Sequence, residues 1–268
     1  MKKTPCIPLF AVALYATFFC WSAAQGGELV AWNSPEGIKR LERSDAKMDF
    51  FVLANRFQSQ KNKLYCGLAS AAIVLNALRE NDPALSPPLD DVVAPKYTRY
   101  LPKDFEPSFF RYGQENILTS GVKTRAAIFG KTEKKKRGKA PDYGLQLEQL
   151  AKLLRKNGAR ATAHPMTDDI KQGDVRRDLA ADMRDPSGFV LVNYLRSSLG
   201  QKGAGHISPL GAYDKKSDSF LILDVNPEVA PWMWADTADL VAAMRTFDVA
   251  QRRGYVIVQQ RTYPYNEK

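Results

Sequence analysis

The stretch of sequence that decides the fold reads Cys66-Gly67-Leu68-Ala69-Ser70-Ala71-Ala72-Ile73-Val74-Leu75-Asn76-Ala77-Leu78-Arg79. Its residues are apolar on nearly every side of a helix, a pattern typical of a helix that lies inside a domain rather than on its surface. We therefore predict a buried helix over residues 67–79, with Cys66 at its N-terminus. The elements on either side must cover this helix.

The N-terminus of the chain is typical of a secretory signal peptide. Two lysines precede an apolar stretch from Ile7 to Trp21, and the small residues Ser22-Ala23-Ala24 follow. We expect residues 1–24 to be removed, which leaves residues 25–268 as a single domain of about 240 residues with a large core. A periplasmic or secreted location follows, without stable membrane association after cleavage. A retained anchor helix is the alternative.

Cleavage makes Cys66 the only cysteine of the mature chain, because Cys6 and Cys20 lie in the leader. A single thiol cannot form an intramolecular disulfide, and a free thiol kept in an oxidising compartment indicates that the thiol is used. The alternative is that Cys66 is a small buried apolar residue, which is common for cysteine.

The formal net charge of the chain is +10, and part of the excess lies in the segment Lys131–Lys139. No aromatic residue is interleaved with these lysines and no helical face collects them, so we interpret the segment as a solvated loop. We therefore expect no nucleic-acid partner and only a mild attraction of small anionic substrates.

Helical patterns dominate the first half of the chain and strand patterns the second half. We predict helices over residues 35–41, 67–79, 108–120, 145–157, 170–184 and 236–244. We predict strands over residues 189–194, 206–213, 220–225 and 255–259. Residues 81–96 carry four prolines and are predicted to form a loop. This order predicts an α+β fold with a cleft between a helical half and an antiparallel sheet half.

The position of Cys66 favours its use as a nucleophile. A helix start offers unpaired backbone N–H groups and the positive end of the helix dipole, and both stabilise a thiolate. A cysteine nucleophile also needs a base, and the chain has two histidines. His164 precedes Pro165 in a stretch that we predict to be irregular. His206 begins a strand after small residues that leave its ring accessible.

A hairpin connects His206 to a carboxylate that can orient its ring. If residues 214–218 form the turn, Tyr213 pairs near Ser219. In that register His206 and Asp224 are diagonal neighbours on one face of the sheet, whereas a slip of one residue separates them. Asp224 also ends an apolar strand, where a carboxylate is rarely buried without a partner.

Gln60 lies six residues before Cys66 and can place its side-chain N–H beside the thiol. With the backbone N–H of Cys66 it would stabilise an oxyanion, although a surface glutamine is the alternative. Asn226 is a weaker alternative to Asp224 as the group that orients the imidazole. The four residues Gln60, Cys66, His206 and Asp224 together predict catalysis of the thiol-protease type.

Four strings of the chain resemble the phytochelatin synthase family in its short bacterial form. They are Gln60-Lys61-Asn62-Lys63-Leu64-Tyr65-Cys66-Gly67, Phe189-Val190-Leu191-Val192-Asn193-Tyr194-Leu195-Arg196, Gly205-His206-Ile207-Ser208-Pro209-Leu210 and Leu221-Ile222-Leu223-Asp224-Val225. The resemblance spans most of residues 48–260 and implies a papain-like cysteine protease fold. It also implies that Cys66 attacks the Cys–Gly amide of glutathione, that glycine leaves, and that a γ-glutamylcysteinyl thioester remains on the enzyme.

The resemblance implies roles for the four residues already discussed. The family's nucleophile matches Cys66, its base His206, its orienting acid Asp224 and its oxyanion glutamine Gln60.

It also implies a set of residues that bind the substrate. Asn193 and Gly205 match positions in the cleft, and Asp248 and Arg253 match polar residues that hold the γ-glutamyl amino and carboxylate groups. An aspartate and an arginine suit a zwitterion chemically, although solvated surface charges are the alternative.

Two departures from the family pattern concern the fate of the thioester. After Asp224 the family usually carries an arginine and an aromatic-basic stretch, where this chain has Asn226-Pro227-Glu228. We also expect no counterpart of the Cys-rich C-terminal region of the plant enzymes. Transfer to a second glutathione, which makes phytochelatin, needs a well-positioned acceptor to compete with water. We therefore expect hydrolysis to γ-glutamylcysteine to be favoured.

We expect no cofactor in the acylation step, and a heavy-metal ion would enter only as a metal–thiolate complex of the substrate. One thiol and two separated histidines are a poor ligand set, so we expect no metal site in the chain. The competing interpretations are a papain-like peptidase or amidase of other specificity, a periplasmic metal-binding protein and a catalytically inactive interaction module. Glutathione is the expected partner, and a homodimer stays open.

Overall fold

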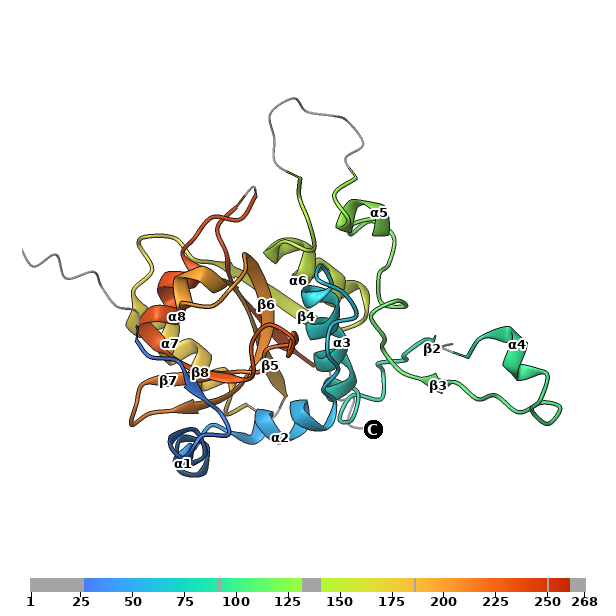
Figure 1. Cartoon of the computed structure of the whole chain (residues 1–268), viewed down its shortest axis with the longest axis horizontal. Coiled ribbons are helices and arrows are strands. Elements are labelled where there is room, and N and C mark those ends of the chain that lie inside the picture. Colours follow the sequence, from blue (N-terminus) through green and yellow to red (C-terminus); the bar gives the residue numbers. More distant parts are fainter. Residues whose placement is uncertain (1–26, 91–92, 132–140, 186, 250, 261–268) are drawn as a thin grey trace, which may run out of the picture.

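The computed structural model describes residues 27–90, 93–131, 141–185, 187–249 and 251–260 (Figure 1). The predicted leader, residues 1–24, lies outside the described residues, and so does most of the lysine-rich segment. Within the described residues, no helix is long and apolar enough to cross a membrane.

The first half of the described chain is mainly helical, and most of the longer strands lie in the second half. The helices are α1 Pro35–Arg43, α2 Met48–Asn55, α3 Cys66–Leu78, α4 Pro95–Thr98, α5 Arg125–Ile128, α6 Leu147–Lys156, α7 Gln172–Asp182, α8 Thr237–Met244 and the 3₁₀-helix η1 Arg196–Leu199. The strands are β1 Val30–Ala31, β2 Leu89–Asp90, β3 Phe109–Phe110, β4 Arg160–Pro165, β5 Gly188–Leu195, β6 Gly205–Asp214, β7 Ser219–Ile222, β8 Met233–Asp236 and β9 Gly254–Gln259.

The strands of the body form one seven-stranded sheet in the order β1-β8-β7-β6-β5-β9-β4. All of its neighbouring strands pair antiparallel. Helices and an antiparallel sheet therefore build the molecule, and the predicted α+β class is confirmed.

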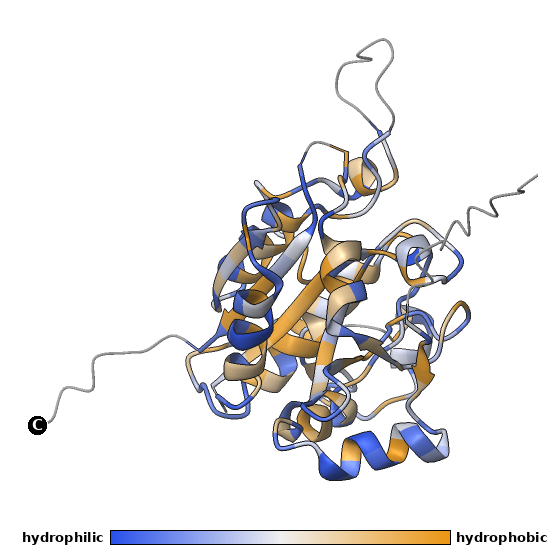
Figure 2. Ribbon diagram, turned by 90° about the vertical axis from the view of Figure 1, so that its left-hand side faces the viewer, coloured by the Kyte–Doolittle hydropathy of each residue, from blue (hydrophilic) through white to orange (hydrophobic). Residues whose placement is uncertain are grey.

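The sheet separates two hydrophobic cores, because side chains along a strand alternate between its faces. In β5, Phe189 and Leu191 belong to one core, and Val190 and Val192 belong to the other. Helices α3 and α6 cover the first face, and α7 and α8 cover the second (Figure 1). Coloured by hydropathy, the strands form an apolar layer between the helices (Figure 2).

Helix α3 is buried along its whole length, as its apolar pattern predicts. It begins at Cys66 and packs against β6, the strand that carries His206. The hydroxyl of Ser70 donates a hydrogen bond to the backbone oxygen of Ile207 over 3.0 Å and ties the helix to that strand. The fold thereby brings the N-terminus of α3 to the beginning of β6.

The predicted helices over 35–41, 145–157, 170–184 and 236–244 correspond to α1, α6, α7 and α8. The predicted helix over 108–120 is wrong. Phe109 and Phe110 form β3, which pairs with β2. At Gly113 the backbone passes so close to Asp90 that a Cβ atom would lie 2.6 Å from a carboxylate oxygen. This close approach, rather than helix propensity, sets the conformation of the segment.

The stretch around His164 is also not irregular as predicted. It forms β4, the strand at one end of the sheet order, and Pro165 is the last residue of that strand. A proline is tolerated there because an edge strand needs fewer N–H donors. Helix α2 was not predicted either.

The hairpin between β6 and β7 differs from the predicted register at its turn. Tyr213 pairs with Phe220 rather than with Ser219, a shift of one residue. An irregularity between Leu210 and Ala212 then removes the shift, so that Leu210 pairs with Ile222 as the predicted register requires. The extra residue is Gly211, whose Cβ position would lie 3.0 Å from the side chain of Leu223. This β-bulge restores the predicted proximity of His206 and Asp224.

Candidate active site

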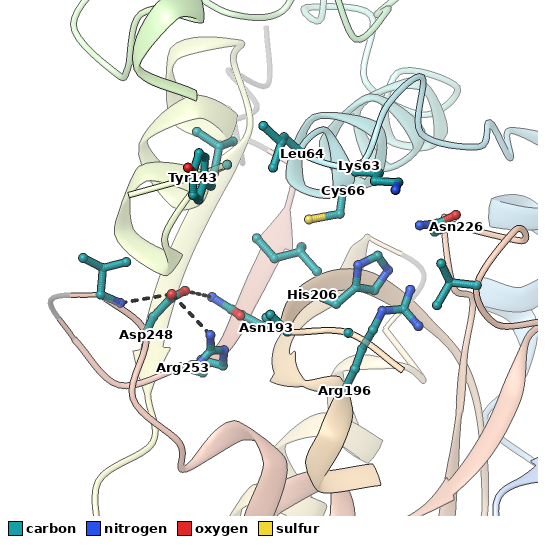
Figure 3. A pocket seen from close by; sticks show the side chains of 18 of the residues that line it. Lys63, Leu64, Cys66, Tyr143, Asn193, Arg196, His206, Asn226, Asp248 and Arg253 are labelled. Carbon is teal, nitrogen blue, oxygen red and sulfur yellow. Dashed lines mark hydrogen bonds and ion pairs between the residues drawn. The ribbon is translucent and has the colours of Figure 1, made fainter. Parts of the chain in front are cut away.

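A cavity of about 410 Å³ opens where the N-terminus of α3 meets the ends of β5 and β6 (Figure 3). Its walls carry Cys66, His206, Asn193, Gly205, Asp248 and Arg253, six of the eight residues predicted to act in the site. The described loops around residues 141–145, 202–205 and 226–229 complete the walls. Segments far apart in the sequence thus converge on one thiol.

Cys66 is a free cysteine and only 8% exposed. Burial raises the pKa of its thiol, but the hydrogen bond to His206, the charge of that ring and the backbone N–H groups of Ile207 and Gly67 outweigh burial. The pKa of Cys66 therefore lies below its ordinary value, with His206 as the main cause of the decrease. The arrangement favours a thiolate.

His206 is the partner of this thiolate. Its Nε2 atom lies 3.0 Å from Oδ1 of Asp224, and the ring packs edge-on against Tyr194. Burial lowers the pKa of His206, but the hydrogen bonds to Asp224 and Cys66 raise it above its ordinary value. The two shifts favour transfer of the thiol proton to the imidazole, which would place a proton where a leaving group could take it.

Asp224 is 1% exposed. Besides its contact with His206, it accepts hydrogen bonds from other groups. Arg196 donates from Nη2 over 2.7 Å, the hydroxyl of Tyr194 donates over 3.1 Å and the backbone N–H of Asn226 donates over 2.8 Å. Burial raises the pKa of Asp224, but His206, Arg196 and the Asn226 N–H bring it below its ordinary value. The carboxylate stays charged and fixes the imidazole.

Arg196 and Tyr194 were not predicted as site residues. Both are buried, at 3% and 0% exposure, and both hold Asp224. The signal in the sequence is a charged residue placed directly after the apolar strand β5, since a buried arginine requires an anionic partner.

A second polar cluster lies on one side of the cavity (Figure 3). Nη2 of Arg253 lies 3.2 Å from Oδ1 of Asp248, and the side-chain amide of Asn193 donates to Oδ2 of Asp248 over 3.5 Å. Arg253 is 5% exposed, and burial lowers its pKa. Gly205 leaves room for this guanidinium, because a Cβ atom there would lie 2.4 Å from Nη2. The four residues predicted to bind the substrate therefore form one cluster.

Gln60 lies near the site but does not line the cavity. Its backbone N–H donates to the carbonyl of Val225 over 2.8 Å, beside Asp224. Its side-chain Nε2 donates to the carbonyl of Asn62 over 2.7 Å, while Oε1 is buried and has no hydrogen-bond partner. One amide hydrogen remains for an oxyanion, so the prediction for Gln60 stays a prediction.

His164 is not near the thiol. It pairs with Tyr255 in the sheet and stacks on that ring at 4.7 Å between centroids. Three strand spacings, about 14 Å, separate β4 from β6. Of the two histidines, the structure brings only His206 to Cys66.

Among the described residues, no group of three or more His, Cys, Asp or Glu side chains is arranged to hold a metal ion. Among the charged residues that line the cavity, Lys63, Arg196, Lys202 and Arg253 are cationic and Asp248 is anionic. Such walls attract a small anion.

Comparison with known proteins identifies the family of the chain. A family model for phytochelatin synthase matches residues 24–90 and 96–255. The chain is 30% identical over 241 residues to glutathione gamma-glutamylcysteinyltransferase 3 of Lotus japonicus, covering 86% of this chain and 42% of that protein. It is 25% identical over 218 residues to the glutathione gamma-glutamylcysteinyltransferase of Schizosaccharomyces pombe, covering 81% of this chain and 44% of that protein.

The chain thus spans less than half the length of these curated relatives. The matched residues nevertheless include Cys66, His206 and Asp224 and the cavity around them. By this match over most of its length, the chain belongs to the phytochelatin synthase family.

Proposed function

We propose that the chain cleaves the Cys–Gly amide of glutathione through a γ-glutamylcysteinyl thioester on Cys66, within a papain-like fold. The observation that carries the proposal is that Cys66 and His206 line one cavity and that Asp224 holds the His206 ring. The names of the relatives, glutathione gamma-glutamylcysteinyltransferases, supply the substrate.

Acylation begins with attack of the Cys66 thiolate on the carbonyl carbon of the Cys–Gly amide. A C–S bond forms and the carbonyl becomes an oxyanion, which the Cys66 N–H and the free amide hydrogen of Gln60 stabilise. The C–N bond then breaks, and the His206 imidazolium gives its proton to the departing glycine nitrogen. Glycine leaves and the thioester remains.

Deacylation uses the same histidine as a base. Neutral His206 removes a proton from water, the resulting hydroxide attacks the thioester, and the C–S bond breaks to return the Cys66 thiolate. We propose water rather than a second glutathione as the main acceptor. In support, residues 226–229 form an exposed turn at the rim of the cavity, where Pro227 replaces the arginine usual in the family.

The γ-glutamyl end of the substrate is an ammonium and a carboxylate on one carbon. Asp248 and Arg253 present the complementary charges in the same cavity, and Asn193 adds a hydrogen bond to Asp248. We propose that this cluster fixes the γ-glutamyl group and so carries the scissile amide to Cys66.

Mass spectrometry tests the acylation step. Incubation with glutathione, followed by rapid acid quenching, should add one γ-glutamylcysteinyl group to Cys66. Substitution Cys66→Ala should abolish both the adduct and glycine release, whereas Ser59→Ala, a control at an exposed residue outside the cavity, should retain them. Glycine release that survives in Cys66→Ala would sink the proposal.

Product analysis tests the deacylation step. With glutathione alone, and again with a thiol-binding metal ion, the chain should release glycine and γ-glutamylcysteine in equal amounts. Predominance of longer γ-glutamylcysteinyl oligomers in both conditions would contradict the preference for water.

Papain-like peptidase activity is the second candidate, since the triad itself does not select a substrate. Asp248→Asn and Arg253→Gln separate the two. Each variant should strongly lower the rate of glutathione cleavage. If the unmodified chain also cleaves an unrelated peptide, each variant should leave that rate unchanged.

A further inference from the structure

The charges on the cavity wall do not all have partners. Arg253 pairs with Asp248, and Arg196 pairs with Asp224. Within the described part of the chain, Lys63 and Lys202 line the same cavity and form no ion pair. The wall therefore offers positive charge beyond what the Asp248–Arg253 cluster uses.

Lys63 lies on the opposite side of the thiol from that cluster (Figure 3). Asp248, Asn193 and Arg253 gather on one side of Cys66 and His206, and Lys63 and Asn226 lie on the other. A ligand that spans the cavity thus meets a zwitterion site first, then the nucleophile, then a lysine.

This order matches the charges along glutathione, so the inference rests on the proposed function. The γ-glutamyl zwitterion is neutral overall and suits the paired Asp248 and Arg253. The remaining charge is the glycine carboxylate, which lies beyond the scissile amide. We propose that Lys63 binds this carboxylate and thereby selects substrates whose leaving group carries a free carboxylate.

The segment that carries Lys63 is fixed relative to the nucleophile. The carbonyl of Asn62 accepts hydrogen bonds from the Tyr65 N–H over 3.2 Å and from Nε2 of Gln60 over 2.7 Å, and Oδ1 of Asn62 accepts from the Leu64 N–H over 3.0 Å. These hydrogen bonds fix the backbone of Lys63, which lies three residues before Cys66. Only the Lys63 side chain must move to reach a bound carboxylate.

Lys202 is the weaker candidate for this role. It lies between Gly200 and Gly203, both with left-handed φ, of +72° and +117°. No contact of Lys202 orders it toward the thiol in the described structure. In the bound substrate, the position of the glycine carboxylate is set by the scissile amide, which must lie at Cys66. A lysine on the same segment as Cys66 therefore binds this carboxylate better than one on a separate loop.

The test compares two substrates that differ in one charge. Glutathione and γ-glutamylcysteinylglycinamide are nearly the same size, but the second has a neutral amide in place of the glycine carboxylate. We expect the unmodified chain to release the leaving group from glutathione with a kcat/KM about fivefold higher, the size of a partly exposed ion pair. The preference should shrink at high salt, because an exposed pair is screened.

Variants of Lys63 should change the preference without changing the chemistry. Lys63→Gln should bring the kcat/KM ratio of the two substrates to about one, Lys63→Glu should invert it, and Lys63→Arg should keep it. Lys61→Gln is the matched control, because Lys61 lies on the same segment but lines a different cavity. It should leave the ratio unchanged, and so should Lys202→Gln.

The outcomes separate this inference from the function on which it rests. A Lys63→Gln variant that loses activity on both substrates equally, or a ratio that changes with Lys202 instead, overturns the role of Lys63 alone. Absence of leaving-group release by the unmodified chain contradicts the proposed function. In that case calorimetric binding of both compounds to Cys66→Ala decides the inference, and equal affinities overturn it.

Discussion

At the scale of single residues, the site depends on how one carboxylate is shared. Asp224 accepts from His206, Arg196 and Tyr194, and burial makes each of these contacts stronger than it would be in water. Arg196 and Tyr194 therefore influence the protonation of His206 through Asp224, although neither is a hydrogen-bond partner of the thiol.

The first prediction concerns the pH dependence of acylation. The proposed acylation needs a deprotonated Cys66, whose pKa is lowered, and a protonated His206, whose pKa is raised. kcat/KM should therefore rise with pH below the ordinary thiol pKa and fall above the ordinary imidazole pKa. Asp224→Asn removes a cause that raises the pKa of His206, so the alkaline limb should move to lower pH. An unchanged alkaline limb in Asp224→Asn contradicts this reading.

The second prediction concerns Arg196 as a positioning residue. Its charge helps to lower the pKa of Asp224, so Arg196→Met should raise that pKa, and protonation of Asp224 should then lower kcat/KM at acid pH beyond the loss that protonation of Cys66 causes. Loss of one charged hydrogen bond should also lower kcat/KM about tenfold or more. Arg196→Lys should recover part of the activity. If both variants unfold at the temperature of the parent and keep its pH profile, Arg196 has no such role.

At the scale of elements, helix α2 has a buried carboxyl group, that of Asp49, which lacks a hydrogen-bond partner on one oxygen. Asp49 is 3% exposed, and its Oδ2 atom has no hydrogen-bond partner. Burial, together with Asp182 and Asp185, raises the pKa of Asp49 to about 8. Burial also raises the pKa of Asp182, at the end of α7, to about 6. The burial of these two carboxyls thus favours their protonated forms.

The third prediction follows from the sign of this shift. Because the folded pKa of Asp49 lies above its ordinary value of 3.8, folding takes up a proton, and the free energy of unfolding should decrease as pH rises from about 4 to 8. Asp49→Asn removes this loss and should stabilise the chain by about 1–3 kcal/mol at pH 8 and by less at pH 5. Urea unfolding at both pH values measures it, with the exposed Asp45→Asn as control. A gain that is the same at both pH values contradicts the prediction.

At the scale of the whole molecule, one segment stands apart from the body. Residues 93–111, with α4 and β3, project from it in Figure 1. Tyr97, Tyr100 and Phe105 are exposed there by 55%, 74% and 58%. The base of this arm is anchored, since the side-chain amide of Asn76 donates to the carbonyl of Tyr112 over 2.7 Å and its oxygen accepts from the Tyr112 N–H over 3.0 Å.

The fourth prediction uses this arm. Brief chymotrypsin treatment should cut the described chain first between Tyr97 and Phe110, because exposed backbone with few packed contacts opens most easily. The two fragments should stay together, and glycine release should persist, because the arm does not line the cavity of Cys66. Loss of activity in step with this cut would show that the arm supports the site.

Much of the site could be predicted because its chemistry is local in sequence. The apolar run after Cys66 predicts α3, and a thiol at a helix start needs no knowledge of the rest of the fold. The proximity of Asp224 to His206 could be predicted only by assuming a register for the hairpin that connects them. That register was shifted at the turn, and the bulge at Gly211 compensated for the shift. A bulge has no reliable signature in a single sequence, since glycine serves many other purposes.

The sequence by itself determined the α+β class and the family resemblance and predicted Cys66 as the nucleophile, because each depends on residue types at short spacing. The sequence predicted His206 rather than His164 as the base, but only the tertiary structure places His164 three strands away in the sheet and His206 in the same cavity as the thiol. It alone placed Arg196 and Tyr194 on Asp224 and Lys63 opposite Asp248. These residues are far apart in the sequence. They meet only when apolar side chains on both faces of the sheet are buried under the helices, because that packing brings the segments around the cavity together.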